Sequence, residues 1–434
     1  MRSVPREDPM LRLLLAIVVA TVHLAPAVAV AQQPDAVLGE IIVEGNTKTD
    51  RAVIDRVIGL EPGDPFPLEA YDRVWDRLED CGYFAFVDLS TREDDTGRVT
   101  LLVTVEEEKT FRATPYVRYD RRHKYLLGAT LTDTNLRGAG ETLEVRAIGY
   151  RIQRGHVSWT KPWFLGRDHL SLRVDGLWEQ GPFVWRPFDY ARWHGLIGLR
   201  QEITGALFVE LGGGYESFEQ KDDYAWRYGG TVVDLAGQTR DVWRLRALAG
   251  LDTRDNPYYP EHGMFHTVEY LHRTGDEIDG QHGFTVDLRV FQQVFDRPIL
   301  ALRAYGRSVD SVGAPEHVLR WGGPETVRGA PYARREGDTA YLLTAEVRWP
   351  LVMMPVSQSG ETVGLGLHGF LDVGDAWYED GGSYLAPVAE GSNRALQSFG
   401  VGAHLNLLTW QLRFEAAKER DGDWTFEFMD VFNF

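Results

Sequence analysis

The chain of 434 residues is 44% hydrophobic and 12% aromatic, and its formal net charge is −18. This charge argues against a nucleic-acid-binding protein, because contacts to phosphates require a basic patch. Beyond residue 31 no stretch approaches the roughly 20 apolar residues of a membrane-spanning helix, which excludes a helical membrane protein. A β-barrel is not excluded, since alternating strands hide their hydrophobicity from such a count.

Residues 1–31 have the composition of a secretory signal peptide. Arg12 precedes the apolar run LLLAIVVATVHLAPAV, and residues 29–31 form a small-residue cleavage pattern. We therefore expect an exported protein whose mature chain begins near Gln32. Cys81 is the only cysteine, so an intramolecular disulfide is excluded.

Residues 32–109 are expected to form one small domain with the order β-α-α-β-β. In the expected second helix, apolar residues recur at helical spacing, so the helix can bury one face. The two final strands are joined by the polar turn EDDTG. The expected elements are a strand over 40–44, a helix capped by Thr49 or Asp50, a helix after Pro67, and strands over 86–91 and 99–105.

Residues 110–434 are predicted to form a transmembrane antiparallel β-barrel. Segments of about 10 residues alternate in polarity and are separated by turn residues, the pattern of membrane strands. We count sixteen strands, although 12 or 14 also fit. The connections after even-numbered strands are short, as expected for turns on one side of the membrane and longer loops on the other.

The last predicted strand has a one-sided aromatic face, which we expect to meet lipid. Thr425 and Glu427 fall on the opposite face. An aromatic residue at the C-terminus resembles the signal by which outer-membrane barrels are recognised for assembly. The residues of this expected signal are Phe426, Phe428, Phe432 and Phe434.

No enzyme motif is found, so we expect no catalytic residues, no metal site and no cofactor. His262 and His266 lie in a Pro/Gly turn rather than on a helix face that could bind zinc. Gly364, Gly366 and Gly369 match a phosphate-loop pattern, but they lie in an alternating strand with no helix after it. A phosphate loop is therefore a poor interpretation.

Several segments resemble one family of outer-membrane proteins. IIVEGNTKTDRAVIDRVIGLEPGDPF, LEDCGYFAFVDL and VTLLVTVEE resemble a POTRA domain. Gly322-Gly323 followed by Val327-Arg328-Gly329 resembles the V-R-G-[FY] loop motif of the BamA/TamA superfamily, and TDTNLRGAGETL, LDTRDNPYYPEHGMF, TAEVRWPL and FLDVGDAW are similar to further family segments. Ala330 departs from the aromatic residue usual there; Tyr332 is the nearest substitute.

The resemblance implies that Arg328 lies on a loop folded into the barrel lumen. A guanidinium there is costly unless its planar donors meet carboxylates. Alternation points Glu346 and Asp372 inward on the two strands after the loop, so both are candidate partners of Arg328. The alternative is that these carboxylates only line a wet lumen. Arg334 and Arg335 are expected to be exposed.

The family resemblance implies a protein that inserts or assembles polypeptides in the outer membrane, with its single POTRA domain in the periplasm. That domain would dock unfolded outer-membrane or secreted clients by strand addition, and would contact a periplasmic partner. The seam between the first strand, 111–119, and the sixteenth would open beside outer-membrane lipid. The alternatives are a dedicated secretion pore and a passive porin; neither nucleic acid nor enzyme activity is implied.

Overall fold

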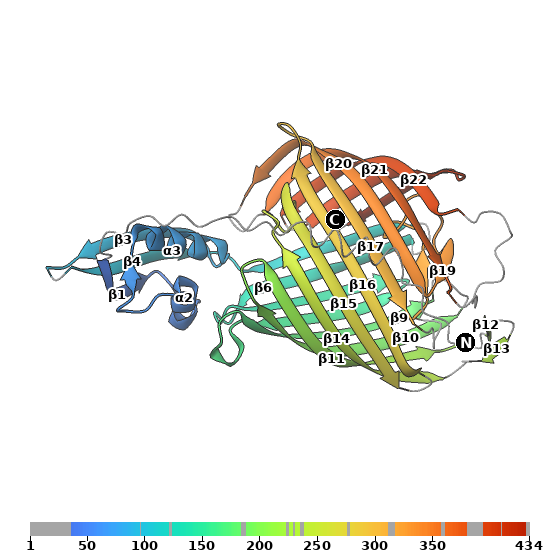
Figure 1. Cartoon of the computed structure of the whole chain (residues 1–434), viewed down its shortest axis with the longest axis horizontal. Coiled ribbons are helices and arrows are strands. Elements are labelled where there is room, and N and C mark those ends of the chain that lie inside the picture. Colours follow the sequence, from blue (N-terminus) through green and yellow to red (C-terminus); the bar gives the residue numbers. More distant parts are fainter. Residues whose placement is uncertain are drawn as a thin grey trace, which may run out of the picture.

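The computed structural model describes a small N-terminal domain followed by a large closed barrel (Figure 1). The described residues are 36–95, 97–120, 124–183, 188–222, 225–228, 231–234, 238–275, 278–310, 317–356, 361–379, 394–408 and 410–430. The expected signal peptide, 1–31, lies outside them. We call the end of the barrel that faces the N-terminal domain the near end and the opposite end the far end.

The N-terminal domain is a four-stranded sheet with two helices. The sheet order is β2-β1-β4-β3, with β1 parallel to β4 and β3 antiparallel to β4. Apolar side chains of both helices and of the sheet, among them Ile54, Leu78 and Leu101, are fully buried in one core. The elements are β1 (Ala36–Glu44), α2 (Arg51–Ile58), β2 (Pro65–Phe66), α3 (Leu68–Asp80), β3 (Phe84–Glu93) and β4 (Arg98–Glu107).

Two details of this domain differ from the prediction. The two-residue strand β2 was not expected, because it is too short to carry a periodic pattern and exists through its pairing with Ala36 and Val37. Asp50 precedes the first helical residue, but its side chain makes no capping hydrogen bond. Thr49 is instead buried, and its backbone and hydroxyl bond to other parts of the chain.

Sixteen antiparallel strands close the barrel, which confirms the predicted fold and strand number. They are β5 (Phe111–Asp120), β6 (Lys124–Leu136), β7 (Glu141–Tyr150), β8 (Gln153–Lys161), β9 (Leu170–Pro182), β10 (Asp189–Glu202), β11 (Leu207–Gln220), β14 (Thr239–Asp252), β15 (His262–Gly275), β16 (Ile278–Gln293), β17 (Ile299–Val309), β20 (Thr339–Pro355), β21 (Thr362–Trp377), β22 (Leu396–Leu408), β23 (Trp410–Glu419) and β24 (Trp424–Asp430).

Two short strand pairs lie in far-end connections. The strands β12 (Ala225–Tyr228) and β13 (Thr231–Asp234) pair between β11 and β14. The strands β18 (Leu319–Trp321) and β19 (Arg335–Gly337) pair between β17 and β20. A 3-10 turn, η1 (Phe164–Gly166), lies in the near-end connection of β8 and β9.

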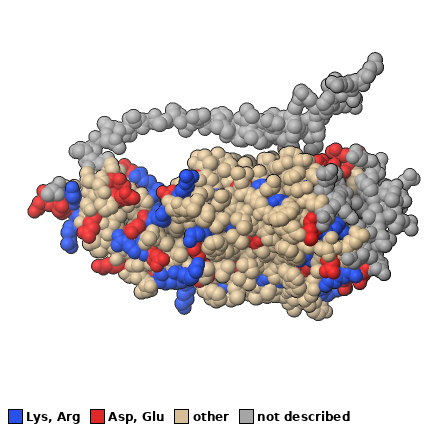
Figure 2. All heavy atoms as spheres, turned by 90° about the horizontal axis from the view of Figure 1, so that it is seen from below, with Lys and Arg blue, Asp and Glu red and all other residues tan. Residues whose placement is uncertain are grey.

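The outer face of the barrel is apolar because successive side chains of a strand point to opposite faces. On β21, Leu365, Leu367 and Leu371 are 45–61% exposed, whereas Phe370 and Asp372 are buried in the lumen. Figure 2 shows the result as a broad, mostly uncharged band between groups of charged side chains. No helix among the described residues is long and apolar enough to cross a membrane.

The seam that closes the barrel joins its first and last strands. Within the described residues, Phe428 of β24 and Tyr119 of β5 form the one paired position between them. Each of the other neighbouring strand pairs of the barrel is registered at seven or more positions. The described part of the seam is thus the most sparsely paired boundary in the wall.

Candidate functional site

A long loop from the far end carries the V-R-G segment into the lumen. It begins and ends as a hairpin, because Leu319 to Trp321 of β18 pair with β19. Within the hairpin, the Val327 side chain is fully buried and packs in an apolar cluster with Trp321, Ala330 and Leu342 of the barrel wall. This packing holds the next residue, Arg328, against the inner face of the barrel.

Arg328 is only 6% exposed and meets three carboxylates. Its Nε and Nη2 donate to the two carboxylate oxygens of Asp372 at 2.8 and 2.9 Å, and its backbone N–H donates to the same group at 3.2 Å. Its Nη1 donates to Glu346 at 2.9 Å and to Glu415 at 3.3 Å. The guanidinium also lies 3.4 Å from the ring centroid of Phe370. The structure therefore brings together the three residues that the sequence paired.

The cluster contains three further charged residues that sequence reasoning did not find. Arg348 donates to Glu346 at 2.9 Å, and Arg413 donates to Glu346 at 2.6 Å. Arg413 also lies 3.0 Å from Glu415, as an ion pair without hydrogen-bond alignment. Three guanidinium groups thus face three carboxylates, which balances the charge of a buried site. Alternation on β23, where Arg413 and Glu415 flank the outward Phe414, was the available signal.

A chain of buried rings extends the cluster towards the near end. His368 contacts Glu415 at 3.1 Å, and its other ring nitrogen lies 3.2 Å from His404. His404 in turn contacts the hydroxyl of Tyr259 at 3.3 Å. Tyr259 belongs to the turn between β14 and β15 and is 1% exposed. The loop from the far end and a turn from the near end are therefore joined inside the lumen.

Two glycines allow the loop to lie close to the barrel wall. Gly329 has a φ of +83°, and a Cβ there would lie 2.9 Å from the backbone nitrogen of Lys418 on β23. A Cβ on Gly374 of β21 would lie 3.0 Å from the Val327 side chain. Ala330 is buried beside this contact, whereas Tyr332 packs against Gly323 elsewhere in the loop. Tyr332 therefore does not take the place of an aromatic residue at position 330.

Other charges of the loop have different surroundings. Arg334 is exposed, as expected. The expectation for Arg335 was wrong: its Nε donates to Asp375 of β21 at 3.2 Å, because β19 lies against the wall. Near the loop tip, Glu325 accepts a hydrogen bond of 2.6 Å from Arg118 of β5. The loop therefore contacts strands on both sides of the seam.

The N-terminal domain is fixed to the near end of the barrel through the end of β6 and the turn between β6 and β7. Asn135, which is 1% exposed, donates to the Thr49 hydroxyl at 2.9 Å and accepts from the Gly140 backbone at 2.8 Å. The Asp50 backbone N–H donates to the Gly138 carbonyl at 2.9 Å. Lys48 lies 3.2 Å from Asp133 of β6.

One carboxylate of the domain organises the segment that docks. Glu107 accepts hydrogen bonds from the Thr47 hydroxyl and, at 2.9 and 2.6 Å, from the backbone N–H groups of Lys48 and Thr49. Burial alone would raise the pKa of Glu107, but these hydrogen bonds outweigh it and lower the pKa to about 2. The carboxylate is therefore ionised under ordinary conditions and holds the docking segment in place.

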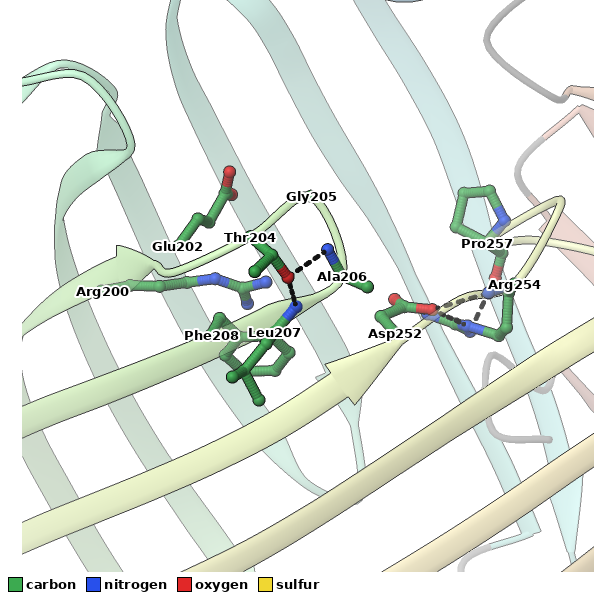
Figure 3. A pocket seen from close by; sticks show the side chains of 10 residues that line it. All are labelled: Arg200, Glu202, Thr204, Gly205, Ala206, Leu207, Phe208, Asp252, Arg254 and Pro257. Atoms are coloured by element: carbon green, nitrogen blue, oxygen red, sulfur yellow. Dashed lines mark hydrogen bonds and ion pairs between the residues drawn. The ribbon is translucent and has the colours of Figure 1, made fainter. Parts of the chain in front are cut away.

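Several cavities between described residues lie in or beside the barrel, and three of them bear on the site. One, of about 640 Å³, separates the N-terminal domain from the barrel at the start of β5. Another, of about 530 Å³, lies in the lumen beside β5 to β8. The third, of about 250 Å³, lies between two near-end turns, where Arg200 stacks on Phe208 and Arg254 pairs with Asp252 (Figure 3). Its ion pair supports the turn between β14 and β15.

The histidines and the described C-terminal aromatic residues that the sequence analysis named lie outside the charged cluster. His262 and His266 belong to β15 rather than to the turn before it, and His262, the first residue of the strand, lies 3.2 Å from Asp255 of that turn. The described residues contain no group of His, Cys, Asp and Glu that could hold a metal ion. Phe426 is 69% exposed on the outer face of β24, and the Phe428 ring lies 4.6 Å from that of Phe414. Phe432 and Phe434 lie outside the described residues.

Comparison with protein-family models gives two matches. Residues 36–108 match the POTRA model, described as a surface antigen variable number repeat. Residues 135–429 match the Omp85 superfamily domain. A search of curated proteins finds no match.

Solved structures with the same fold cover nearly the whole chain. BamA from Haemophilus ducreyi lacking POTRA domains 1–3 is 15% identical, with a TM-score of 0.66 over 91% of this chain and 84% of that one. CdiB from Acinetobacter baumannii is 12% identical, with a TM-score of 0.60 over 92% and 74%. CdiB from Escherichia coli is 12% identical, with a TM-score of 0.57 over 94% and 92%.

Proposed function

Because the chain belongs to the Omp85 superfamily and is an outer-membrane barrel of the insertion or secretion class, we propose that it inserts polypeptides into the outer membrane. In this proposal residues 1–31 direct export, and the N-terminal domain lies in the periplasm, where it receives unfolded clients. Members of this superfamily are transport or assembly proteins, so the charged cluster of the lumen is assigned a structural role rather than a catalytic one.

The observation that carries this proposal is the path from the N-terminal domain to the seam. In the described residues β3 pairs only with β4, so its outer edge is free to accept another strand. Phe84 and Ala85 of β3 line the same cavity of about 640 Å³ as Phe111, the first residue of β5. A client strand added to β3 would therefore lie beside the near end of the sparsely paired seam between β5 and β24.

The physical driving force is the pairing of backbone groups in a solvent without water. Each strand that enters hydrocarbon must satisfy its N–H and C=O groups by pairing with a neighbour. An opened edge of β5 or β24 offers those partners to a client strand. No nucleotide is required, because client folding and the burial of apolar side chains in lipid supply the free energy.

The test is site-specific photo-crosslinking to a urea-unfolded outer-membrane barrel client, with the full chain reconstituted in vesicles. A crosslinker at Phe86, which is 56% exposed on β3, and one at Phe111 of β5 are expected to capture the client. Leu68 on α3, which is 78% exposed but away from the β3 edge, is the matched control. Equal capture at all three positions, or no gain in client folding rate over empty vesicles, would contradict insertion.

A secretion pore is the second candidate, and the lumen cavity of about 530 Å³ favours it. That cavity is polar, lined by Thr114, Thr130 and several arginines, and could accommodate an extended peptide. A crosslinker at Thr130 separates the two functions. Capture of a secreted polypeptide at Thr130 without capture at Phe111 would support passage through the lumen.

A further inference from the structure

The far half of the lumen holds a second group of arginines whose surroundings differ from those of Arg328. Arg244 of β14 and Arg273 of β15 lie directly opposite each other in the strand register and therefore share one face of the sheet. That face is the lumen, because Trp243 and Leu245, on either side of Arg244, are exposed on the outer face. Arg307 of β17 and Arg240 of β14, together with Arg273 and Arg244, act electrostatically on His317 at the start of the long loop. Like charges placed opposite each other on a sheet repel.

Two carboxylates close to this group are paired with arginines other than Arg273. Glu269 lies four residues before Arg273 on the same face of β15, and Glu216 lies on β11, the strand that pairs with β14 beside Arg244. Glu216, however, accepts from Arg244 at 3.1 Å, and Glu269 accepts from Arg246 at 2.6 Å. Among the described residues, neither lies within ion-pair distance of Arg273.

Arg273 is therefore a buried guanidinium whose one hydrogen-bond partner in the described residues is neutral. It is 6% exposed, and its Nη1 donates to the amide oxygen of Gln281 at 2.8 Å. Its Nε is buried and has no hydrogen-bond partner among the residues that the structure describes, and the same holds for the Arg244 Nε and the His317 Nδ1. By contrast, all three donor nitrogens of Arg328 meet carboxylates. Unmet charge and unmet donors in one place define a site for an anion.

We propose that Arg273, Arg244 and His317 form a binding site for a small oxyanion of the phosphate type in the far half of the lumen. Planar guanidinium donors match the oxygen geometry of such an anion, which would also separate the two opposed arginines. The donors face the lumen and not the lipid, so the ligand is a soluble anion rather than a lipid headgroup. Bound there, it would tie the start of the long loop to β14 and β15. This site is independent of the proposed insertion function.

The test is thermal unfolding of the purified full chain in a zwitterionic buffer, with inorganic phosphate titrated against chloride at constant ionic strength. The unfolding temperature of the wild type is expected to rise with phosphate and to saturate. Arg273→Gln is expected to weaken the apparent phosphate affinity by about tenfold or more, since it removes charge-assisted hydrogen bonds. Without phosphate, the same variant is expected to be no less stable than the wild type, because it removes a repelled charge.

Two further variants make the result specific. Arg303→Gln is the matched control, because Arg303 shares Asp287 with Arg289 and its loss leaves that pair intact. Glu216→Gln removes a compensating carboxylate and is expected to tighten phosphate binding, which also gives a readout if Arg273→Gln fails to fold. A non-saturating rise, equal phosphate responses in the wild type and Arg273→Gln, or unchanged affinity in Glu216→Gln would overturn the proposal.

Discussion

Replacement of Arg328 by alanine is expected to be the most damaging single change in the long loop. The replacement leaves its three carboxylate partners with different numbers of remaining ion pairs. Glu346 keeps Arg348 and Arg413, whereas Asp372 has no other ion-pair partner in the described residues. Asp372, which is fully buried, would therefore carry the uncompensated charge.

The expected loss of stability follows from the uncompensated charge on Asp372. Removing one partner of a buried ion pair costs about 3–5 kcal/mol, and loss of the contact with Phe370 adds up to about 2 kcal/mol. Arg334→Ala, at an exposed position of the same loop, should change stability by no more than about 0.5 kcal/mol. The double variant Arg328→Ala/Asp372→Asn should be less unstable than the sum of its singles, by up to about 3 kcal/mol.

Urea unfolding in lipid vesicles, followed by tryptophan fluorescence, measures these differences. The same cycle with Glu346→Gln should give a smaller coupling energy to Arg328, because two other arginines hold that carboxylate. Additive effects of Arg328→Ala and Asp372→Asn would refute the assignment of the charge to this pair. Equal stability of Arg328→Ala and Arg334→Ala would refute the structural role of the loop altogether.

Four other changes test separate parts of the molecule. Gly329→Ala should destabilise the barrel by about 1–3 kcal/mol in the same urea assay, because its φ is +83° and its Cβ would crowd Lys418; wild-type stability would contradict the close approach. The contribution of Glu107 to docking is fully present above its ordinary pKa of 4.5 and is lost as pH falls through about 2. Small-angle scattering should therefore show the release of the N-terminal domain from the barrel in that pH interval. A Glu107→Gln variant should lack this transition. Burial raises the pKa of the Cys81 thiol to about 11, so maleimide should label it at pH 8 only after unfolding, and rapid labelling of the folded chain would count against that burial. Deletion of residues 431–434 should lower the amount of barrel in outer membranes, and unchanged amounts would show that the C-terminal aromatics are not an assembly signal.

The barrel was predictable because its pattern is repeated in every strand. A period of two, sustained over segments such as that around Leu365 and Leu367, identifies an outward face without knowledge of neighbours. The same rule placed Glu346 and Asp372 in the lumen. Sixteen strands could be counted because turn residues separate them, and the structure confirms the number.

What the sequence did not reveal depends on contacts between distant strands. Glu415 joins Arg328 across 87 positions of the chain, and alternation alone says which face it occupies but not which loop descends beside it. Arg335 was expected in solvent because its neighbours are charged, yet the short strand β19 lies on the wall and brings Asp375 to it. The docking of Asn135 to Thr49 likewise requires the relative position of two domains, which no local pattern encodes.

The long loop is held very differently on the two sides of the seam. Arg328 is held to β20, β21 and β23 by buried charges, whereas Glu325, with 70% of its side chain exposed, forms an ion pair with Arg118 of β5. A pair with one exposed partner is partly screened by solvent, so it is weaker than the fully buried group around Arg328. If β5 separates from β24, the weak contact therefore breaks first. The loop then moves as one rigid body with the C-terminal strands, while the N-terminal domain stays with β6. One side of the opened seam therefore carries the long loop, and the other carries the N-terminal domain.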